Sequence, residues 1–479
     1  MVPQRLHKRS LHELALHVSL MGFNCIRLTY ATHMFTCYAN LTVAQRLQNL
    51  NLTNAIAGIK ENNPDLLNAT VVDAQKAVIE ELGLNGVMVL LDNQISKPMW
   101  CCNDDDGNGF FGDKYFDPNE WLQCLSLVST RYKDTQTVIA MSFRNELRGP
   151  LQSERVWYQY VEKGAQTIHS GNPNVLVLIS SLNYDLDFQG LRNRSFFFFF
   201  WQSPKLGTYG KIWNSKHIPD QSNEIIHMRV THICSRSHLF IEIMNQQFRK
   251  LEPYRSNGQF FVNMKRYEVG FLTKGKNPAP LFVTEFGVDQ MGENPSDNKL
   301  LPCFMAYLAR HGLDWALWAL QASYYLRDGH QDHDETYGMF NSNWRHLKSL
   351  EFHSKLHTIT LLTNFGNGLI YPKSDGRSYK ILYHLLSGKC ARANKSNDIH
   401  VSECWEMSKW DHQGEGTPTI LQGTRSCLKA IGDGLLVALT IDCKSNQSKW
   451  TLASNSQFQL ASKHENGTEL CLDWDPYHS

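Results

Sequence analysis

The chain has 479 residues, of which 42% are hydrophobic and 19% are charged. This length excludes a single small module, because one domain usually holds about 100 to 200 residues. The composition supports a large buried core and excludes a mainly disordered chain. Lys and Arg number 47 against 46 Asp and Glu, which leaves a formal charge of +1. We therefore expect a neutral ligand and no nucleic acid. No apolar run approaches the ~18 to 20 residues of a membrane span.

The start of the chain does not read as a signal peptide. Residues 1–19 are basic, but His12, Glu13 and His17 interrupt them, and an apolar stretch with a small-residue cleavage site is missing. Instead, four regularly spaced apolar residues predict an amphipathic helix: Leu11, Leu14, Val18 and Met21.

Other features favour secretion. Twelve cysteines, an even number, permit disulfides. Seven Asn-x-Ser/Thr sequons occur, at Asn40, Asn51, Asn68, Asn193, Asn394, Asn446 and Asn466. We expect a secreted, extracellular protein whose Met1 is an internal methionine of a longer product; the alternative is a protein that stays inside the cell.

Between residues 20 and 320, short apolar or β-branched runs alternate with helical patterns, which is typical of a parallel α/β fold. The predicted strands are 24–28, 87–91, 138–143, 175–180, 281–284 and 315–318. The predicted helices are 71–82, 121–132 and 157–169. Polar residues accompany four strand ends: Arg27, then 92–94, 145–146 and Glu285. A (β/α)8 barrel builds its active site at these ends.

Two of these polar residues, Glu146 and Glu285, each follow a predicted strand. Two carboxyl groups that face each other across a barrel mouth suit glycosidic cleavage, in which one donates a proton and the other attacks the anomeric carbon. A separation of ~5 to 5.5 Å would mean retention of configuration. The alternative is that both glutamates only pair with Arg144 and Arg148 at the rim.

The same region resembles a clan A glycoside hydrolase of family 5, most closely the plant cellulase-like members. The matching words are GFNCIR at 22–27, LDN at 91–93, SKP at 96–98, DGNGFFGD at 106–113, SFRNELRGP at 142–150, FVTEFGVDQ at 282–290 and DWALW at 314–318. The resemblance implies a (β/α)8 TIM-type barrel over residues 1–360 that needs no cofactor. It also implies roles for particular residues: acid/base for Glu146, nucleophile for Glu285, and substrate or nucleophile contacts for Arg27, Asn145 and Trp318.

Three departures from the family bear on activity. The strand that precedes the helix at 8–21 has no residues left to form it, so we expect a barrel that lacks its first strand. Gln94 replaces the family's His, and an amide cannot titrate near neutral pH. The strand-six His-x-Tyr is replaced by an atypical insertion at 202–279. We interpret 202 to about 270 as translated non-coding sequence.

The sequence pattern changes in the tail, residues 370–479. The words Ser408-Lys409-Trp410 and Ser448-Lys449-Trp450 recur with cysteines at similar spacing, which indicates a repeated unit. The tail resembles an incomplete ricin-B-type β-trefoil, although Ser replaces the usual Gln of its Gln-x-Trp words. We expect Trp410 and Trp450 to be core residues and leave sugar binding open.

Weaker motifs lie on the loop after the second predicted strand. Asp104-x-Asp106-x-Asn108-Gly109 opens like a calcium loop, but Tyr115 stands where Glu is needed. The adjacent Cys101 and Cys102 have no metal-ligand spacing, and we predict no metal site. Three aromatic residues of this loop either line a sugar cleft or pack beneath it: Trp100, Phe110 and Phe111.

We therefore predict a monomeric retaining β-glycoside hydrolase that acts on a plant-type polysaccharide or oligosaccharide, a β-1,4-glucan or mannan. Glu285 would attack and Glu146 would serve as acid and base, with Gln94 among the substrate contacts. The alternative is a catalytically impaired carbohydrate-binding pseudoenzyme or a truncated gene product. The missing family elements favour the alternative, and the presence of both glutamates favours recent decay or a faulty gene model over a long-established binding role.

Overall fold

The structure is a computed structural model, which describes most of the chain in two compact units. The described residues are 4–185, 187, 239–244, 281–290, 304, 308, 314–321, 323–353, 356, 379–384, 389–394, 396, 398–403, 406–453 and 459–472. Those up to 290 and from 314 to 349 belong to the first unit, and 304, 308 and those from Leu350 onward to the second. The predicted domain bounds, 1–360 and 370–479, stay predictions.

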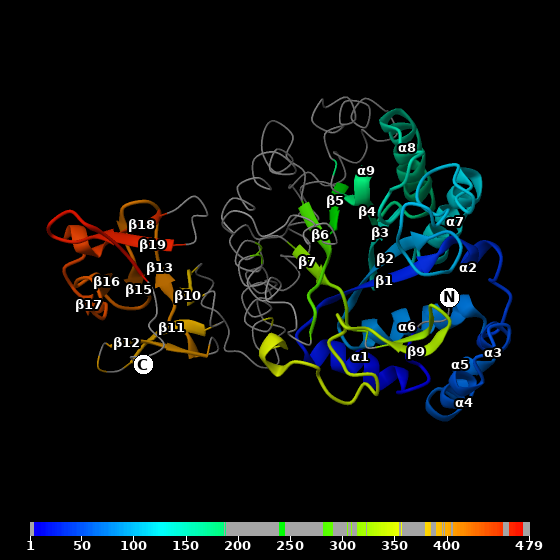
Figure 1. Cartoon of the computed structure of the whole chain (residues 1–479), viewed down its shortest axis with the longest axis horizontal. Helices are drawn as coiled ribbons and strands as arrows, with labels where there is room; N and C mark the ends of the chain where they lie inside the picture. Colours follow the sequence, from blue (N-terminus) through cyan, green and yellow to red (C-terminus); the bar gives the residue numbers. More distant parts are fainter. Residues whose placement is uncertain are drawn as a thin grey trace. The chain divides into compact units, whose positions relative to one another are not determined.

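The first unit is built on one parallel sheet of seven strands that follow each other in chain order (Figure 1). Its strands are β1 (Cys25–Ala31), β2 (Met88–Ile95), β3 (Val138–Ser142), β4 (Leu176–Ile179), β5 (Leu239–Met244), β6 (Leu281–Phe286) and β7 (Asp314–Leu317). Six of them are the strands predicted from the sequence. The additional strand, β5, lies inside the segment 202–279, where the sequence pattern predicts no strand.

The central strands are buried on both faces, which explains their nearly continuous apolar sequences. Leu90 of β2, Ala140 of β3 and Leu178 of β4 pack in one cluster. The neighbours of Leu90 along β2, Val89 and Leu91, point to the opposite face and are also fully buried. Both faces of these strands therefore contribute to the core of the first unit.

Helices connect the parallel strands. They are α1 (Leu11–Leu20), α2 (Thr32–Thr36), α3 (Val43–Gln48), α4 (Thr53–Asn62), α5 (Pro64–Leu67), α6 (Val71–Leu84), α7 (Pro118–Arg131), α8 (Glu154–Gly171) and the short α9 (Leu182–Asp185). Figure 1 shows α7 and α8 side by side beyond β3 and β4, and these two helices pack on each other. The sequence predicts α1, α6, α7 and α8, whereas α2 to α5 and α9 are additional.

Two buried tryptophans fix α7 and α8 to the ends of strands. Trp121 Nε1 donates to the carbonyl of Phe143, just after β3, at 2.6 Å. Trp157 Nε1 donates to the carbonyl of Ser180, just after β4, at 3.0 Å. Each indole thus satisfies a main-chain acceptor where its strand ends, beside the polar residues of the candidate site.

No strand precedes α1 among the described residues, because residues 4–9 form turns. These turns are bound to an antiparallel hairpin that follows β7, formed by β8 (Ser323–Arg327) and β9 (His330–Asp334). Arg5 Nη1 donates to Ser323 Oγ at 3.0 Å, and Lys8 Nζ contacts Asp332 Oδ2 at 2.8 Å. Within the described chain the sheet runs from β1 to β7.

The second unit contains short antiparallel strands. They are β10 (Tyr383–His384), β11 (Lys389–Ala393), β12 (Ile399–Ser402), β13 (Trp410–Asp411), β14 (Thr417–Pro418), β15 (Ile420–Leu421), β16 (Cys427–Lys429), β17 (Ala438–Thr440), β18 (Lys449–Ala453), β19 (Gln459–Lys463) and β20 (Glu469–Cys471), with a 3-10 turn at Asn446–Ser448. Trp410 and Trp450 are buried in one cluster, which confirms that they are core residues. A disulfide joins Cys427 and Cys443. The β-trefoil stays a prediction.

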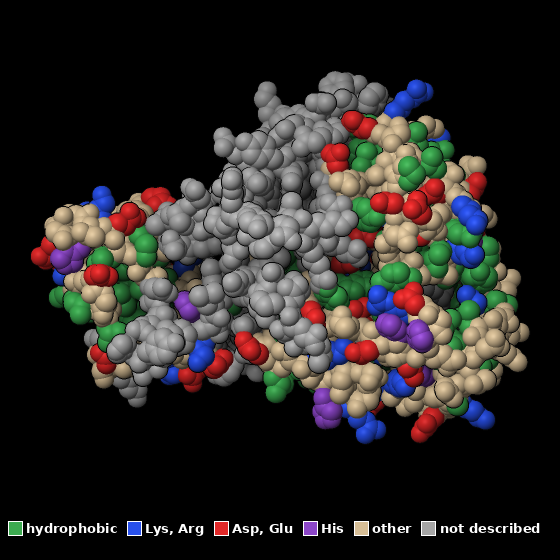
Figure 2. Space-filling model, viewed as in Figure 1, with side chains coloured by type: hydrophobic (Ala, Val, Ile, Leu, Met, Phe, Trp, Pro, Cys, Tyr) green, Lys and Arg blue, Asp and Glu red, His purple; other side chains and the backbone are tan. Residues whose placement is uncertain are grey.

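The described surface carries charges of both signs. Figure 2 shows acidic and basic side chains interspersed with apolar ones on the described part of this face, in keeping with the formal charge of +1. No helix in the described part of the chain is both long and apolar enough to cross a membrane.

Candidate active site

Arg27 of β1 gathers three polar side chains from three other places in the first unit. Its Nη1 lies 2.8 Å from Glu285 Oε2 on β6, and its Nη2 donates to Asn145 Oδ1, after β3, at 2.6 Å. Nη2 also lies 3.2 Å from Asp92 Oδ2 on β2. The Arg27 side chain is only 6% exposed, so these contacts form in a largely water-excluded place. Three of the residues that the sequence analysis singles out are thereby brought together: Arg27, Asn145 and Glu285.

Glu146 follows Asn145 directly and has an unusual backbone. Its φ is 40°, in the left-handed region that residues with a side chain seldom adopt, and it is 1% exposed. Asp185 Oδ2 accepts from its main-chain nitrogen at 3.3 Å, and Arg148 Nη1 donates to its carbonyl at 2.7 Å. Such a conformation persists where surrounding contacts hold it, which is common at active sites.

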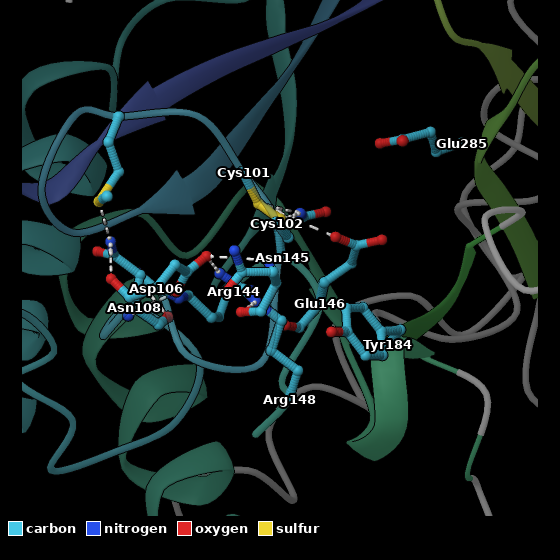
Figure 3. The surroundings of a disulfide bond; sticks show 12 residues. Cys101, Cys102, Asp106, Asn108, Arg144, Asn145, Glu146, Arg148, Tyr184 and Glu285 are labelled. Atoms are coloured by element: carbon cyan, nitrogen blue, oxygen red, sulfur yellow. Dashed lines mark hydrogen bonds and ion pairs between the residues drawn. A yellow bond between two sulfur atoms is a disulfide. The ribbon is translucent and has the colours of Figure 1, made fainter. Parts of the chain in front are cut away.

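The two glutamates lie near the ends of two strands. Figure 3 shows both side chains, that of Glu146 in the loop after β3 and that of Glu285 on β6. Both belong to the first unit, and Arg27 connects Glu285 with the residue before Glu146. The arrangement supplies two carboxyl groups and a fixed cation at the carboxyl ends of parallel strands.

Two further predicted residues lie on the same sheet. Gln94 is near the end of β2 and is 8% exposed, and its Oε1 has no hydrogen-bond partner among the described residues. Trp318 directly follows β7, where its main-chain nitrogen donates to the carbonyl of Phe286 at 2.7 Å. A Cβ added to Gly287 would lie 2.2 Å from the Trp318 carbonyl oxygen, so glycine permits this close approach.

The rim arginines do not pair with the two glutamates. Arg144 Nη1 donates to Asn93 Oδ1 and Ser96 Oγ, both at 3.1 Å, and its guanidinium stacks on the Phe116 ring. Burial lowers the pKa of Arg144 to about 9. Arg148 Nη2 instead bonds to Asp106 Oδ2. Among the described residues, neither guanidinium donates to a carboxylate of Glu146 or Glu285, so the simple rim-pair alternative is not what the structure shows.

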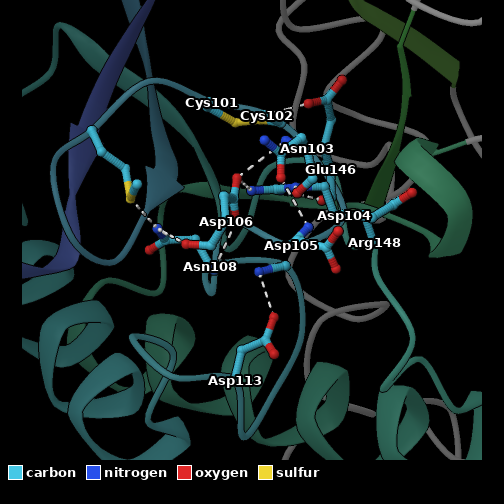
Figure 4. A network of polar contacts seen from close by, with 12 residues as sticks. Cys101, Cys102, Asn103, Asp104, Asp105, Asp106, Asn108, Asp113, Glu146 and Arg148 are labelled. Atoms are coloured by element: carbon cyan, nitrogen blue, oxygen red, sulfur yellow. Dashed lines mark hydrogen bonds and ion pairs between the residues drawn. A yellow bond between two sulfur atoms is a disulfide. The ribbon is translucent and has the colours of Figure 1, made fainter. Parts of the chain in front are cut away.

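The calcium-like motif at 104–109 lies in a loop whose carboxylates hydrogen-bond to the backbone of the loop itself (Figure 4). Asp106 Oδ2 accepts from the main-chain nitrogen of Asn103 at 3.2 Å as well as from Arg148, and Asp106 Oδ1 accepts from the nitrogen of Asn108 at 2.8 Å. Asp113 Oδ2 accepts from the nitrogen of Gly109 at 2.9 Å. These carboxylates therefore fix the loop that begins after β2.

The aromatic residues of this loop divide between the two alternatives. Phe110 and Phe111 are 1% and 6% exposed and pack beneath the loop. Trp100 is 38% exposed, with its ring 5.5 Å from that of Tyr324 and the guanidinium of Arg327 stacked 3.5 Å above it. Of the three, Trp100 has the exposure that a sugar contact needs.

Two groups of described residues place possible metal-ligand atoms within 4.8 Å of one another. One consists of His33, Cys37 and Glu120, where α2 meets α7. The other consists of Cys101, Cys102 and Glu146, but its two sulfurs are joined in a disulfide and cannot act as thiolate ligands.

Sequence reasoning missed three contributions to the site. Asp92 occurs in a recognised sequence word, but its ion pair with Arg27 depends on strand register. Asp185 reaches Glu146 from 39 residues further along the chain. The adjacent cysteines permit either free thiols or a disulfide in a loop, and the sequence does not place them beside Asn145 and Glu146. The insertion at 202–279, which replaces the family's His-x-Tyr, lies outside the described residues except for Leu239–Met244.

Comparisons with known proteins identify the family of this chain. The model of the family "Cellulase (glycosyl hydrolase family 5)" matches residues 6–323. A glycosyl hydrolase 5 family protein of Chamaecyparis obtusa is 38% identical over 486 residues, covering 98% of this chain and 81% of that protein. An endoglucanase of Paenibacillus polymyxa is 21% identical, covering 66% and 70% respectively.

Solved structures show the same fold. An endocellulase of Pyrococcus horikoshii, in complex with cellotetraose, aligns with a TM-score of 0.52 at 14% identity, covering 76% of this chain and 88% of that one. The catalytic domain of the major endoglucanase of Xanthomonas campestris aligns with a TM-score of 0.51 at 15% identity, covering 76% and 90%. At these identities the likeness concerns the fold alone.

Proposed function

Because this chain belongs to glycosyl hydrolase family 5, the cellulase family, and is thus a glycosidase that hydrolyses O-glycosyl compounds, we propose that it cleaves a β-1,4-glucan with retention of configuration. One observation carries the residue assignment. The Arg27 guanidinium donates both to Glu285 and to Asn145, the residue before Glu146. The proposed nucleophile and the sugar-binding amide are thereby held by one fixed cation, and the proposed acid/base is the next residue in the chain.

In the first step, Glu285 attacks the anomeric carbon and Glu146 gives its proton to the leaving oxygen. The bond from the anomeric carbon to the leaving oxygen breaks as the bond to Glu285 forms, which leaves a covalent glycosyl ester. Arg27 neutralises and orients the attacking carboxylate through the 2.8 Å contact.

In the second step, the ionised Glu146 takes a proton from water. The resulting hydroxide-like oxygen attacks the anomeric carbon, and Glu285 leaves as a carboxylate. Two inversions give net retention. No residue changes its oxidation state, and the catalytic groups return to their starting protonation.

Three neighbours would bind the reacting sugar. Asn145 is oriented by Arg27, so its amide NH2 can donate to the sugar 2-hydroxyl. Gln94 Oε1 can accept from another hydroxyl, since it has no partner in the described chain. Trp318 supplies an aromatic face where the sugar ring can pack. Each role concerns ground-state binding or transition-state positioning rather than proton transfer.

One comparison favours a glucan over a mannan. The Paenibacillus polymyxa relative, which is 21% identical to this chain, is an endoglucanase, and the matching family model is that of the cellulases.

The test is reducing-end release by purified, monodisperse protein on β-1,4-glucan, mannan and xylan, comparing wild type with Glu285→Gln. We expect glucan cleavage by wild type and a loss of about 1,000-fold or more in the variant. Preference for mannan would correct the substrate. An inactive wild type that melts cooperatively would favour the impaired carbohydrate-binding protein.

A further inference from the structure

A disulfide lies within the proposed active site. Cys101 and Cys102, neighbours in the chain, are joined in the loop after β2, and both are half-buried. Figure 3 shows the pair beside Asn145 and Glu146. None of the residue roles given above involves this disulfide.

The disulfide contacts Asn145 at the end opposite Arg27. Asn145 Nδ2 lies 3.9 Å from Cys101 Sγ and 4.0 Å from Cys102 Sγ, whereas Asn145 Oδ1 accepts from Arg27 Nη2 at 2.6 Å. A disulfide sulfur has no proton and can only accept, so it favours the amide orientation with NH2 toward the sulfurs. The second amide hydrogen stays available for a sugar hydroxyl.

The same disulfide contacts the proposed acid/base. Cys101 Sγ lies 3.9 Å from Glu146 Oε2. Because an oxidised sulfur cannot donate, any hydrogen bond between them must be donated by the protonated Glu146 carboxyl group. That protonated form is the one that the first step requires. Two adjacent residues of one loop therefore touch both the proposed acid/base and the amide that precedes it.

We propose that the Cys101–Cys102 disulfide is a positioning element of the active site, which fixes the Glu146 carboxyl group, beside Asn145, for proton donation to the leaving group. This inference rests on the proposed function. The ring closed by a disulfide between adjacent residues has fewer conformations than two residues with free thiols. It can therefore limit the conformations of the side chains that pack on it. The disulfide acts through its neighbours and takes no part in bond making.

The test uses the double variant Cys101→Ser/Cys102→Ser in the full chain. The matched control is Cys427→Ser/Cys443→Ser, which removes a disulfide of the second unit. Substrates are aryl β-cellobiosides with graded leaving groups. Phenol is a poor leaving group and needs protonation, whereas 2,4-dinitrophenolate leaves without it.

We expect kcat/KM of the Cys101/Cys102 variant to fall about 10-fold or more on phenyl cellobioside and less than about 3-fold on the dinitrophenyl substrate. The control should match wild type on both. If the disulfide only stabilises the fold, its removal should lower kcat/KM equally on both substrates. That equal loss, or no loss at all, would overturn the proposal.

Two measurements keep the result interpretable. Alkylation and mass spectrometry of active wild type must show Cys101 and Cys102 without free thiols, since free thiols in active protein would overturn the proposal. If the double variant does not fold, brief reduction of folded wild type by a phosphine replaces it, with the same two substrates and the same criterion. Wild type that cleaves neither substrate would contradict the proposed function, and the inference would fall with it.

Discussion

Arg27 is the residue on which the site depends most. Its guanidinium is nearly buried between Asp92, Asn145 and Glu285. Removing one partner of a buried ion pair leaves the other charges uncompensated, which typically costs several kcal/mol. Arginine also supplies a planar fork of donors that lysine lacks.

The first prediction follows from this arrangement. Arg27→Met should lower the free energy of unfolding by about 3 to 5 kcal/mol and abolish measurable glucan cleavage, because it leaves Asp92 and Glu285 buried without their cation. Arg27→Lys, the matched control, should keep more stability but lose most activity, since one ammonium cannot serve both Asn145 and Glu285. Urea unfolding and kcat/KM measure the two effects; a Met variant as stable as wild type would contradict the account.

Gln94 supports a second prediction in which stability and activity separate. Its buried Oε1 has no partner in the described chain, and an unsatisfied buried polar atom costs about 1 to 3 kcal/mol. Gln94→Leu should therefore leave the melting temperature unchanged or raised, while KM for cello-oligosaccharides rises about 10-fold with the loss of a hydrogen bond. An unchanged KM would remove Gln94 from the substrate contacts.

The sequence predicts the proposed catalytic and substrate-binding residues better than it predicts the residues that hold them in place. Arg27, Asn145 and Glu285 were identified by family words and strand ends, and the structure joins them directly. The supporting residues were not identified, because contacts such as that between Asp185 and Glu146 depend on how distant loops fold against each other. No local sequence pattern encodes such a contact.

At the scale of elements, the hairpin of β8 and β9 binds the N-terminal turns. His7 Nε2 contacts Asp332 Oδ1 at 2.9 Å, and its ring lies 4.6 Å from that of Tyr325. Burial lowers the pKa of His7, and the hydrogen bond to Asp332 opposes this only in part, while the charges of Lys8 and Arg5 add to the lowering.

This lowered pKa gives a third prediction. The unfolded chain binds a proton at His7 near pH 6.5, whereas the folded chain binds it only at lower pH, so stability falls as pH drops below about 6.5. The pKa of Asp332 is also lowered from its ordinary value of 3.8. Its contribution to stability therefore changes only below about pH 3.8, well below the pH range in which His7 acts. Between pH 7.5 and 5.5, His7→Gln should lose less melting temperature than wild type. Equal losses would contradict the assignment.

The elements that the sequence predicts share a simple signal. The strands buried on both faces read as continuous apolar runs, and α6, α7 and α8 have clear helical periodicity. The helix α3 was not predicted, although Thr42 and Gln45 form a capping box that marks its start. Strand β5 was not predicted because the surrounding segment has no strand-helix alternation to place it.

At the scale of the whole molecule, two compact units suggest that catalysis and the second unit's stability can be separated. Trp450 is 1% exposed, and its Nε1 donates to the Leu428 carbonyl at 2.8 Å. The candidate site lies wholly in the first unit. We further propose that the second unit is the ricin-B-like β-trefoil expected from the sequence.

The fourth prediction uses this separation. Trp450→Ala should destabilise the second unit by about 3 to 5 kcal/mol, through the lost core volume and hydrogen bond. It should leave kcat/KM on a soluble aryl cellobioside unchanged. Ile441→Ala, at an 84% exposed position of the same unit, is the control that should change neither quantity. Calorimetry and kinetics check both; an equal loss of activity in Trp450→Ala would show that the units act as one.

The central claim, that Glu285 is the nucleophile of a retaining glycosidase, can be tested directly. A 2-deoxy-2-fluoro-cellobiosyl substrate with an activated leaving group slows the second step, so the glycosyl ester accumulates on the enzyme. Peptide mass spectrometry of the trapped protein should locate one cellobiosyl adduct on Glu285. An adduct on another carboxylate, or an active enzyme that forms none and releases product of inverted configuration, would contradict the account.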